Sequence, residues 1–157
     1  MSIDCITRPA LTVIGLLVEA QWQELPRAVP AAWNQLFARQ GELNPSCGPL
    51  GEHLEVSISR DGGHYRELVG VIVEPDAKPP AGMIKLTIPA NRYLRLVHEG
   101  PLVGITAGFQ ALHDRAAAEG LEATDLKLDI GYQPGLPPGR HELLIGLAPL
   151  AEPQQAA

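Results

Sequence analysis

Ser57, Ser59, Asp61 and His64 lie close together in the sequence, and hydrolases use these residue types as nucleophile, acid and base. A glycine pair follows Asp61 directly, which is the composition of a tight turn between two strands. The Gly-x-Ser-x-Gly pattern that presents a nucleophilic serine does not occur in the chain. We therefore interpret this group as the polar end of a β-hairpin rather than as a catalytic site.

The histidines do not have the spacing of metal ligands. They are His53, His64, His98, His113 and His141. The chain also contains neither standard form of the glycine-rich loop that cradles phosphate groups. From these patterns we expect neither a metal ion nor a cofactor.

The charge balance argues against direct nucleic-acid binding. The chain of 157 residues has 12 lysines and arginines against 18 aspartates and glutamates, a net charge of −6, with no basic cluster. Its hydrophobic content of 45% is typical of one globular domain, and no apolar run reaches the ~20 residues of a membrane helix. The N-terminus has no secretory-signal pattern. We expect one cytoplasmic domain over residues 1–150, with a frayed tail at 151–157.

The first half of the chain predicts a strand, a helix and a hairpin in that order. Residues 11–18 form a short apolar run that suits a buried strand. Pro30 suits the first position of a helix, whose apolar stripe includes Trp33 and which ends near Gly41. The next two strands are expected at residues 53–59 and 65–73, joined by the turn described above.

The second half repeats this order after a proline-rich connector at residues 74–82. Pro101 opens a second amphipathic helix, and Gly120 suits its C-terminal cap. Two strands are expected before this helix and two after it. These four strands are residues 83–88, 93–98, 126–132 and 141–147.

The two helices match at a constant offset of 76 positions. The matched pairs are Trp33 with Phe109, Leu36 with Leu112, and Arg39 with Arg115. Together with the repeated order of elements, this offset indicates a duplication of one strand-helix-strand-strand unit. We expect an α+β fold with one copy at residues 11–73 and the other at 83–147.

Several short motifs resemble the GyrI-like, or AraC-type effector-binding, domain family over about residues 10–150. The motifs are residues 12–16 (TVIGL), 30–33 (PAAW) with Leu36, 68–71 (LVGV), 88–93 (IPANRY) and 98–101 (HEGP). The resemblance implies a pseudo-twofold antiparallel sheet with two helices on one face and a ligand cleft between the copies on the other. Members of the family sense drugs and other hydrophobic compounds, sometimes fused to a DNA-binding domain. Some members bind gyrase or hydrolyse reactive ligands.

This chain has no room before Leu11 for a helix-turn-helix module, so we expect a stand-alone receptor domain. A role in transcription would then need a separate DNA-binding partner. The oligomeric state and the identity of the ligand do not follow from these patterns.

Strand alternation selects the candidate acids of the cleft. If Leu128 and Ile130 point to the helices, then Asp129 faces the cleft, and in the last strand Glu142 is set apart from its apolar neighbours. The resemblance implies an acid followed by an aromatic residue at this place, which Asp129 and Tyr132 match, and Glu142 fits the acid of the final strand. Alternatively, Asp129 is a solvated strand residue that pairs with Lys127 or an arginine.

Aromatic residues are scarce, so each one bears on the pocket. Trp33 is either core or a pocket wall, and the resemblance favours the wall. Tyr65 and Tyr93 stand near strand starts, where a ring can line a cavity while its hydroxyl reaches polar groups. The predicted ligand-binding set is therefore Trp33, Tyr65, Tyr93, Asp129, Tyr132 and Glu142.

Three functions fit these observations. The favoured one is a small-molecule receptor for a hydrophobic ligand, cationic or aromatic, because an acid in an apolar cleft pairs best with a cation. The second is a hydrolase with a cleft carboxylate of raised pKa, which is less favoured because no activated nucleophile accompanies it. The third is a protein-interaction module that binds gyrase or a regulator through a surface patch.

Overall fold

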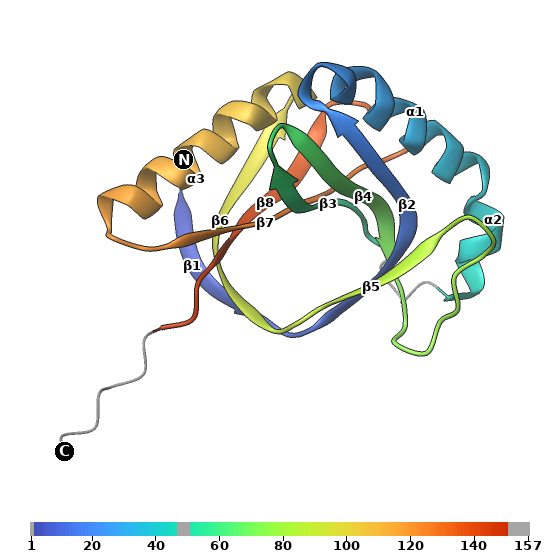
Figure 1. Cartoon of the computed structure of the whole chain (residues 1–157), viewed down its shortest axis with the longest axis horizontal. Coiled ribbons are helices and arrows are strands. Elements are labelled where there is room, and N and C mark those ends of the chain that lie inside the picture. The colour runs from blue at the N-terminus through green and yellow to red at the C-terminus, as the bar shows by residue number, and fades with distance from the viewer. Residues whose placement is uncertain (1, 47–50, 151–157) are drawn as a thin grey trace.

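The computed structural model describes residues 2–46 and 51–150 and contains one eight-stranded antiparallel sheet with two long helices on one face (Figure 1). The strands are β1 Ile3–Arg8, β2 Leu11–Gln21, β3 His53–Asp61, β4 His64–Ile72, β5 Ile84–Ile88, β6 Asn91–Gly100, β7 Ala123–Ile130 and β8 Gly139–Leu147. The helices are α1 Leu25–Ala38, α2 Gln40–Leu43 and α3 Ile105–Ala118. The predicted α+β class is confirmed. The tail predicted to fray, residues 151–157, lies outside the described residues.

The strand order in the sheet is β1-β6-β8-β7-β3-β4-β2-β5, which is symmetric about the central pair β7 and β3. Each half contains a long strand, a helix and a hairpin, and each half gives its first short strand to the other half. β1 pairs with β6, and β5 pairs with β2. The chain turns at Pro9 between β1 and β2, and at Pro89 between β5 and β6, where each proline lacks an N–H for the ladder.

Two local predictions need correction. Strand β1 was not expected, because its six residues are mostly polar or exposed and form no apolar run. Helix α1 begins at Leu25 instead of Pro30, with Pro26 in its first turn and Pro30 inside the helix. Pro30 is tolerated because it removes a single helical hydrogen bond close to the helix start. The predicted cap at Gly120 is confirmed, since its φ is +68°.

The two faces of the curved sheet carry different cores. On the helix face, α1 packs on β2 and β4, and α3 packs on β6 and β8. The opposite face is filled by apolar side chains from strands of both halves. Among them are Leu54, Val56, Leu68, Tyr93, Leu128 and Leu144. Leu128 and Ile130 therefore point away from the helices, contrary to expectation.

The position of the cleft relative to the helices follows from this packing. The two cavities bordered by α1 and α3 lie on the helix face, whereas the cleft was expected on the opposite face. The side of β7 that carries Asp129 is the side that the helices cover and that the cavity beneath α3 borders. Among the described residues, no helix is long and apolar enough to cross a membrane.

Candidate ligand-binding cleft

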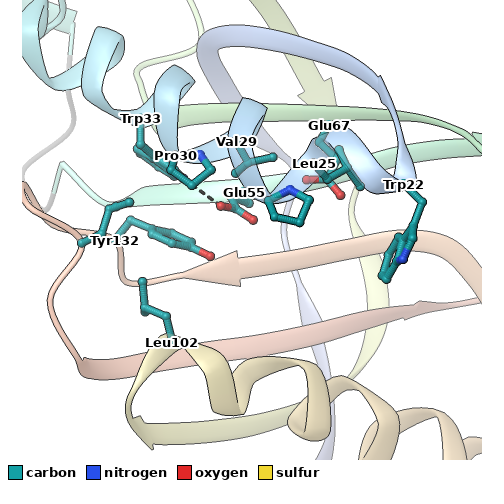
Figure 2. Close-up of a pocket in the computed structure, with 11 residues that line it drawn as sticks. Trp22, Leu25, Val29, Pro30, Trp33, Glu55, Glu67, Leu102 and Tyr132 are labelled. Atoms are coloured by element: carbon teal, nitrogen blue, oxygen red, sulfur yellow. Dashed lines mark hydrogen bonds between the residues drawn. The ribbon is translucent and has the colours of Figure 1, made fainter.

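A cavity of about 340 Å³ lies between α1 and the sheet, and we call it the α1 lobe (Figure 2). Its wall from α1 consists of Leu25, Pro26, Val29, Pro30 and Trp33. Glu55 and Glu67 point into it from the sheet, and Tyr132 stands across from the helix. The lobe is therefore an apolar and aromatic space with carboxyl groups on its floor.

A second cavity of about 360 Å³ lies beneath α3, and we call it the α3 lobe. It shares Trp22, Glu55, Glu67, Leu102 and Tyr132 with the α1 lobe. Because the two lobes share this lining, they form one cleft between the helices. The α3 lobe is more polar, since Ser57, Lys127 and Asp129 also line it.

The strand register explains the polar floor of the cleft. Ser57 of β3 lies between Glu67 of β4 and Lys127 of β7, and Glu55 lies beside Asp129 in the neighbouring row. Residues two apart on a strand share a face, so these five side chains all belong to the helix face. The helices cover the flanks of this face and leave its centre open as the cleft.

Glu55 is the acid at the middle of the cleft. The indole Nε1–H of Trp33 donates a hydrogen bond of 2.8 Å to its Oε1. Burial raises the pKa of Glu55 to about 8, the negative charge of Asp129 adds to the rise, and the Trp33 hydrogen bond opposes it. In the empty cleft near neutral pH, most of the Glu55 carboxyl is therefore protonated.

Aromatic rings form a continuous wall beside Glu55. The ring of Trp33 stacks on Tyr132 at 4.6 Å between centroids and on Phe37 at 5.2 Å. Trp33 has no exposed surface, yet it lines the α1 lobe. Trp33 was expected to be either a core residue or a wall of the pocket, and in the structure its ring is both.

Asp129 is a buried residue that holds Tyr132 in place. It is 3% exposed, accepts a hydrogen bond of 2.6 Å from the Tyr132 hydroxyl, and lies 2.7 Å from Nδ1 of His141. The alternative that Asp129 is solvated and pairs with Lys127 or an arginine is therefore wrong. Burial first, then the charges of Glu55 and Asp129, raise the pKa of Tyr132, so its hydroxyl stays a donor.

Gly131 directly precedes Tyr132, and its backbone has a φ of +142°, which suits glycine alone. A Cβ at Gly131 would collide with the backbone carbonyl oxygen of Arg140. This close approach turns the chain at the end of β7, so that Tyr132 stacks against the helix face.

The other predicted site residues lie apart from this group. Tyr65 lines a smaller cavity of about 140 Å³ beside the α3 lobe, with its ring 5.5 Å from that of Trp22. Tyr93 is 1% exposed and belongs to the core of the opposite face. Glu142 also points to that face, where it pairs with Arg8 at 3.2 Å and Arg95 at 2.9 Å.

Asp129 and Glu142 do not form the neighbouring pair of carboxylates that we expected. The register places Asp129 opposite Leu143 and Glu142 opposite Ile130. Adjacent residues of a strand point to opposite faces, so the sheet separates these two acids. The acid that does lie beside Asp129 in the cleft is Glu55.

The comparisons with known proteins agree with this fold. The family described as integron-associated effector binding protein, Cass2, matches residues 5–131. This chain belongs to the Cass2 effector-binding family. The GyrI-like resemblance read from the sequence motifs is thereby confirmed.

Relatives of this effector-binding domain include regulators. The transcriptional regulator BrlR of Pseudomonas aeruginosa is 25% identical over 118 residues, which are 74% of this chain and 43% of BrlR. The chain thus spans less than half the length of that curated relative.

Two solved structures share the effector-binding fold. SAV2435 bound to tetraphenylphosphonium matches with a TM-score of 0.74 at 14% identity, over 96% of each chain. The integron cassette protein VCH_CASS2 of Vibrio cholerae matches with a TM-score of 0.69 at 9% identity, over 93% of this chain and 95% of that one. At these identities the likeness shows the fold alone.

The main functional candidates that the sequence analysis missed in this effector-binding domain are Glu55 and Glu67. Both stand at polar positions of alternating strands, which are usually solvent-facing when one face of a sheet is open. One sequence feature pointed to Glu67. Val69 is an apolar residue two positions along the same strand, so the two side chains share a face, and in the structure Val69 packs beneath α1. Within the described ranges, no group of three or more His, Cys, Asp or Glu side chains could hold a metal ion.

Proposed function

We propose that this domain is a receptor for a lipophilic cation with aromatic groups, bound between α1 and α3 with Glu55 as its counter-ion. The observation that carries the proposal is the carboxyl group of Glu55 on the floor of an apolar and aromatic cavity. A carboxylate in such a place is unfavourable alone and is stabilised by an incoming opposite charge.

The walls of the cleft suit the organic part of such a ligand. The stacked rings of Trp33 and Tyr132 offer π faces, which attract cations as well as aromatic groups. The two lobes, of about 340 and 360 Å³, fall within the range of small-molecule pockets. The structure of SAV2435 bound to tetraphenylphosphonium supports this ligand class, because it places such a cation on a protein of the same fold.

We further propose that ligand binding is reported to another module. The match to the regulator BrlR supports an effector role in transcription. Because this chain has a net charge of −6, contact with DNA would be made by a DNA-binding domain or a separate partner. Gyrase is the other partner class that the family resemblance implies.

Isothermal titration calorimetry with three probes of related shape tests the receptor proposal. Tetraphenylphosphonium is a cation, tetraphenylborate is a nearly isosteric anion, and triphenylphosphine oxide is neutral. We expect the cation to bind and the anion to bind at least tenfold more weakly, because a cation is stabilised by the ionised forms of Glu55 and Glu67, whereas an anion finds no opposite charge on this floor. Equal affinities for the cation and the anion would refute the role of the carboxyl floor.

The matched variants are Glu55→Gln in the cleft and Glu122→Gln, which replaces an exposed glutamate outside the cleft. We expect Glu55→Gln to weaken the phosphonium by about ten- to a hundredfold, the usual effect of losing an interaction with a charged partner. Glu122→Gln should bind like the parent protein.

A further inference from the structure

Lys127 is a basic side chain in the α3 lobe whose charge is not matched by the protein. Its Nζ lies 5.7 Å from the centroid of the Phe109 ring. Within the part of the chain that the structure describes, this ammonium makes no hydrogen bond and no salt bridge. Glu67 and Asp125 act on it electrostatically, but each lies beyond salt-bridge distance.

The surroundings of Lys127 hold hydrogen-bond donors beside the carboxylates of Glu67 and Asp125. The hydroxyl of Ser57, directly opposite on β3, has no hydrogen-bond partner among the described residues. Burial, and then the positive charges of Lys127 and Arg60, lower the pKa of His113, so its ring is neutral and offers one N–H. Burial and then the charge of Arg60 lower the pKa of Lys127, and the charges of Glu67 and Asp125 oppose this.

A simple cation in the cleft leaves this ammonium uncompensated and adds a like charge nearby. Glu55 and Lys127 are diagonal neighbours across β3 and β7, because Lys127 pairs with Ser57, two residues along from Glu55. The Cα atoms of diagonal neighbours are about 7–8 Å apart. The α3 lobe therefore contains the Glu55 carboxyl and the Lys127 ammonium on neighbouring strands, within the span of a single small molecule.

We propose that the ligand of this cleft is zwitterionic. Its cationic aromatic part occupies the α1 lobe beside Glu55, and an anionic group of the carboxylate class binds Lys127 and Ser57 in the α3 lobe. This inference rests on the proposed receptor function and specifies its ligand class.

A pair of compounds that differ only in the anionic group tests the proposal. The first is (4-carboxybutyl)triphenylphosphonium, a zwitterion at pH 7.5, and the second is its methyl ester, a plain cation. In calorimetric titrations of the parent protein, we expect the acid to bind at least tenfold more tightly than the ester, as a charge-assisted contact provides. Equal or weaker binding of the acid overturns the proposal without any variant.

The variant Lys127→Met keeps a flexible side chain against Phe109 and removes the charge. We expect it to remove the advantage of the acid and to tighten binding of the ester, since a like charge has gone. Lys78→Met, which replaces an exposed lysine of the 74–82 connector, is the control and should leave both affinities as in the parent. An advantage of the acid that survives Lys127→Met also overturns the proposal.

The outcomes separate this inference from the receptor function. Ester binding that depends on Glu55, together with no advantage for the acid, leaves the receptor intact and refutes the zwitterion. If neither compound binds, or if Glu55→Gln has no effect on the ester, the receptor proposal fails and takes the inference with it.

Discussion

The indole nitrogen of Trp33 donates a hydrogen bond of 2.8 Å to Glu55, so the aromatic wall of the cleft is fixed to its acid. This bond is the first of two side-chain interactions, with Trp33 and then with Tyr132, that oppose the rise of the Glu55 pKa. We expect Trp33→Phe, which keeps a ring and removes the donor, to raise the Glu55 pKa further. The pH midpoint of phosphonium binding should therefore move to higher pH. A midpoint that stays in place would show that the hydrogen bond does not tune this carboxyl.

Phosphonium binding to the parent protein should depend on pH because the cation requires ionised Glu55. With a pKa of about 8, affinity should rise with pH, by up to about tenfold per unit below pH 8, and then level off. Glu67, whose pKa is also raised by burial, acts in the same direction. Titration calorimetry from pH 6 to 9 measures this, and Glu55→Gln should flatten most of the rise. Affinity that falls with rising pH contradicts the scheme.

The stability of the empty protein should have the opposite pH dependence. Between the ordinary Glu pKa of 4.5 and about 8, the folded protein binds more protons at Glu55 than the unfolded chain does. The stabilising contribution of Glu55 is thus complete below pH 4.5 and is lost as pH rises through 8. Thermal unfolding at pH 9 should show Glu55→Gln to be more stable than the parent, on the order of 1–3 kcal/mol. A less stable variant at pH 9 would count against a raised pKa.

Tyr132→Phe removes the hydroxyl that donates to Asp129 and keeps the ring stacked on Trp33. Of its side-chain hydrogen bonds within the described residues, the buried Asp129 then retains the one with His141. We expect urea unfolding to show a loss of about 1–3 kcal/mol, the cost of leaving a buried acceptor short of a partner. Unchanged stability would mean that Asp129 does not depend on this contact. Among the described residues the hydroxyl of half-buried Tyr65 makes no hydrogen bond, so Tyr65→Phe should be neutral and serves as a comparison.

Receptor and hydrolase are separated by the fate of the ligand. His141 is 1% exposed and is engaged by Asp129, so it is poorly placed to activate a water in the cleft. We expect mass spectrometry to recover a hydrolysable cleft ligand, such as the phosphonium methyl ester, unchanged after prolonged incubation. Turnover that depends on Glu55 or Asp129 would favour the enzyme.

The order of helices and strands followed from the sequence because hydrophobic periodicity and turn residues are local properties. Strand β1 was not predicted from the sequence because its stability comes from pairing with β6, which is far away in the chain. The start of α1 was not predictable because both Pro26 and Pro30 suit the first turn of a helix, and Pro26 occupies that position in the structure. Local pattern therefore predicted the elements better than it predicted their ends or their partners.

The candidate site was predictable where a residue's environment follows from its own strand. Trp33, Asp129 and Tyr132 line the cleft as expected. Glu142 lies on the face opposite the helices. Its face was not predictable because the alternation of residues along one strand does not show which face of the sheet the helices cover. Glu55 was missed because its neighbour Asp129 comes from the other half of the chain, and only the β3–β7 pairing brings the two acids together.

A crystal structure of the protein with tetraphenylphosphonium tests the central claim most directly. We predict the phosphonium between α1 and α3, with a phenyl ring against Trp33 or Tyr132 and the phosphorus within about 4–6 Å of the Glu55 carboxylate. A cation bound elsewhere, for example on the opposite face beside Glu142 and its arginines, would contradict the account.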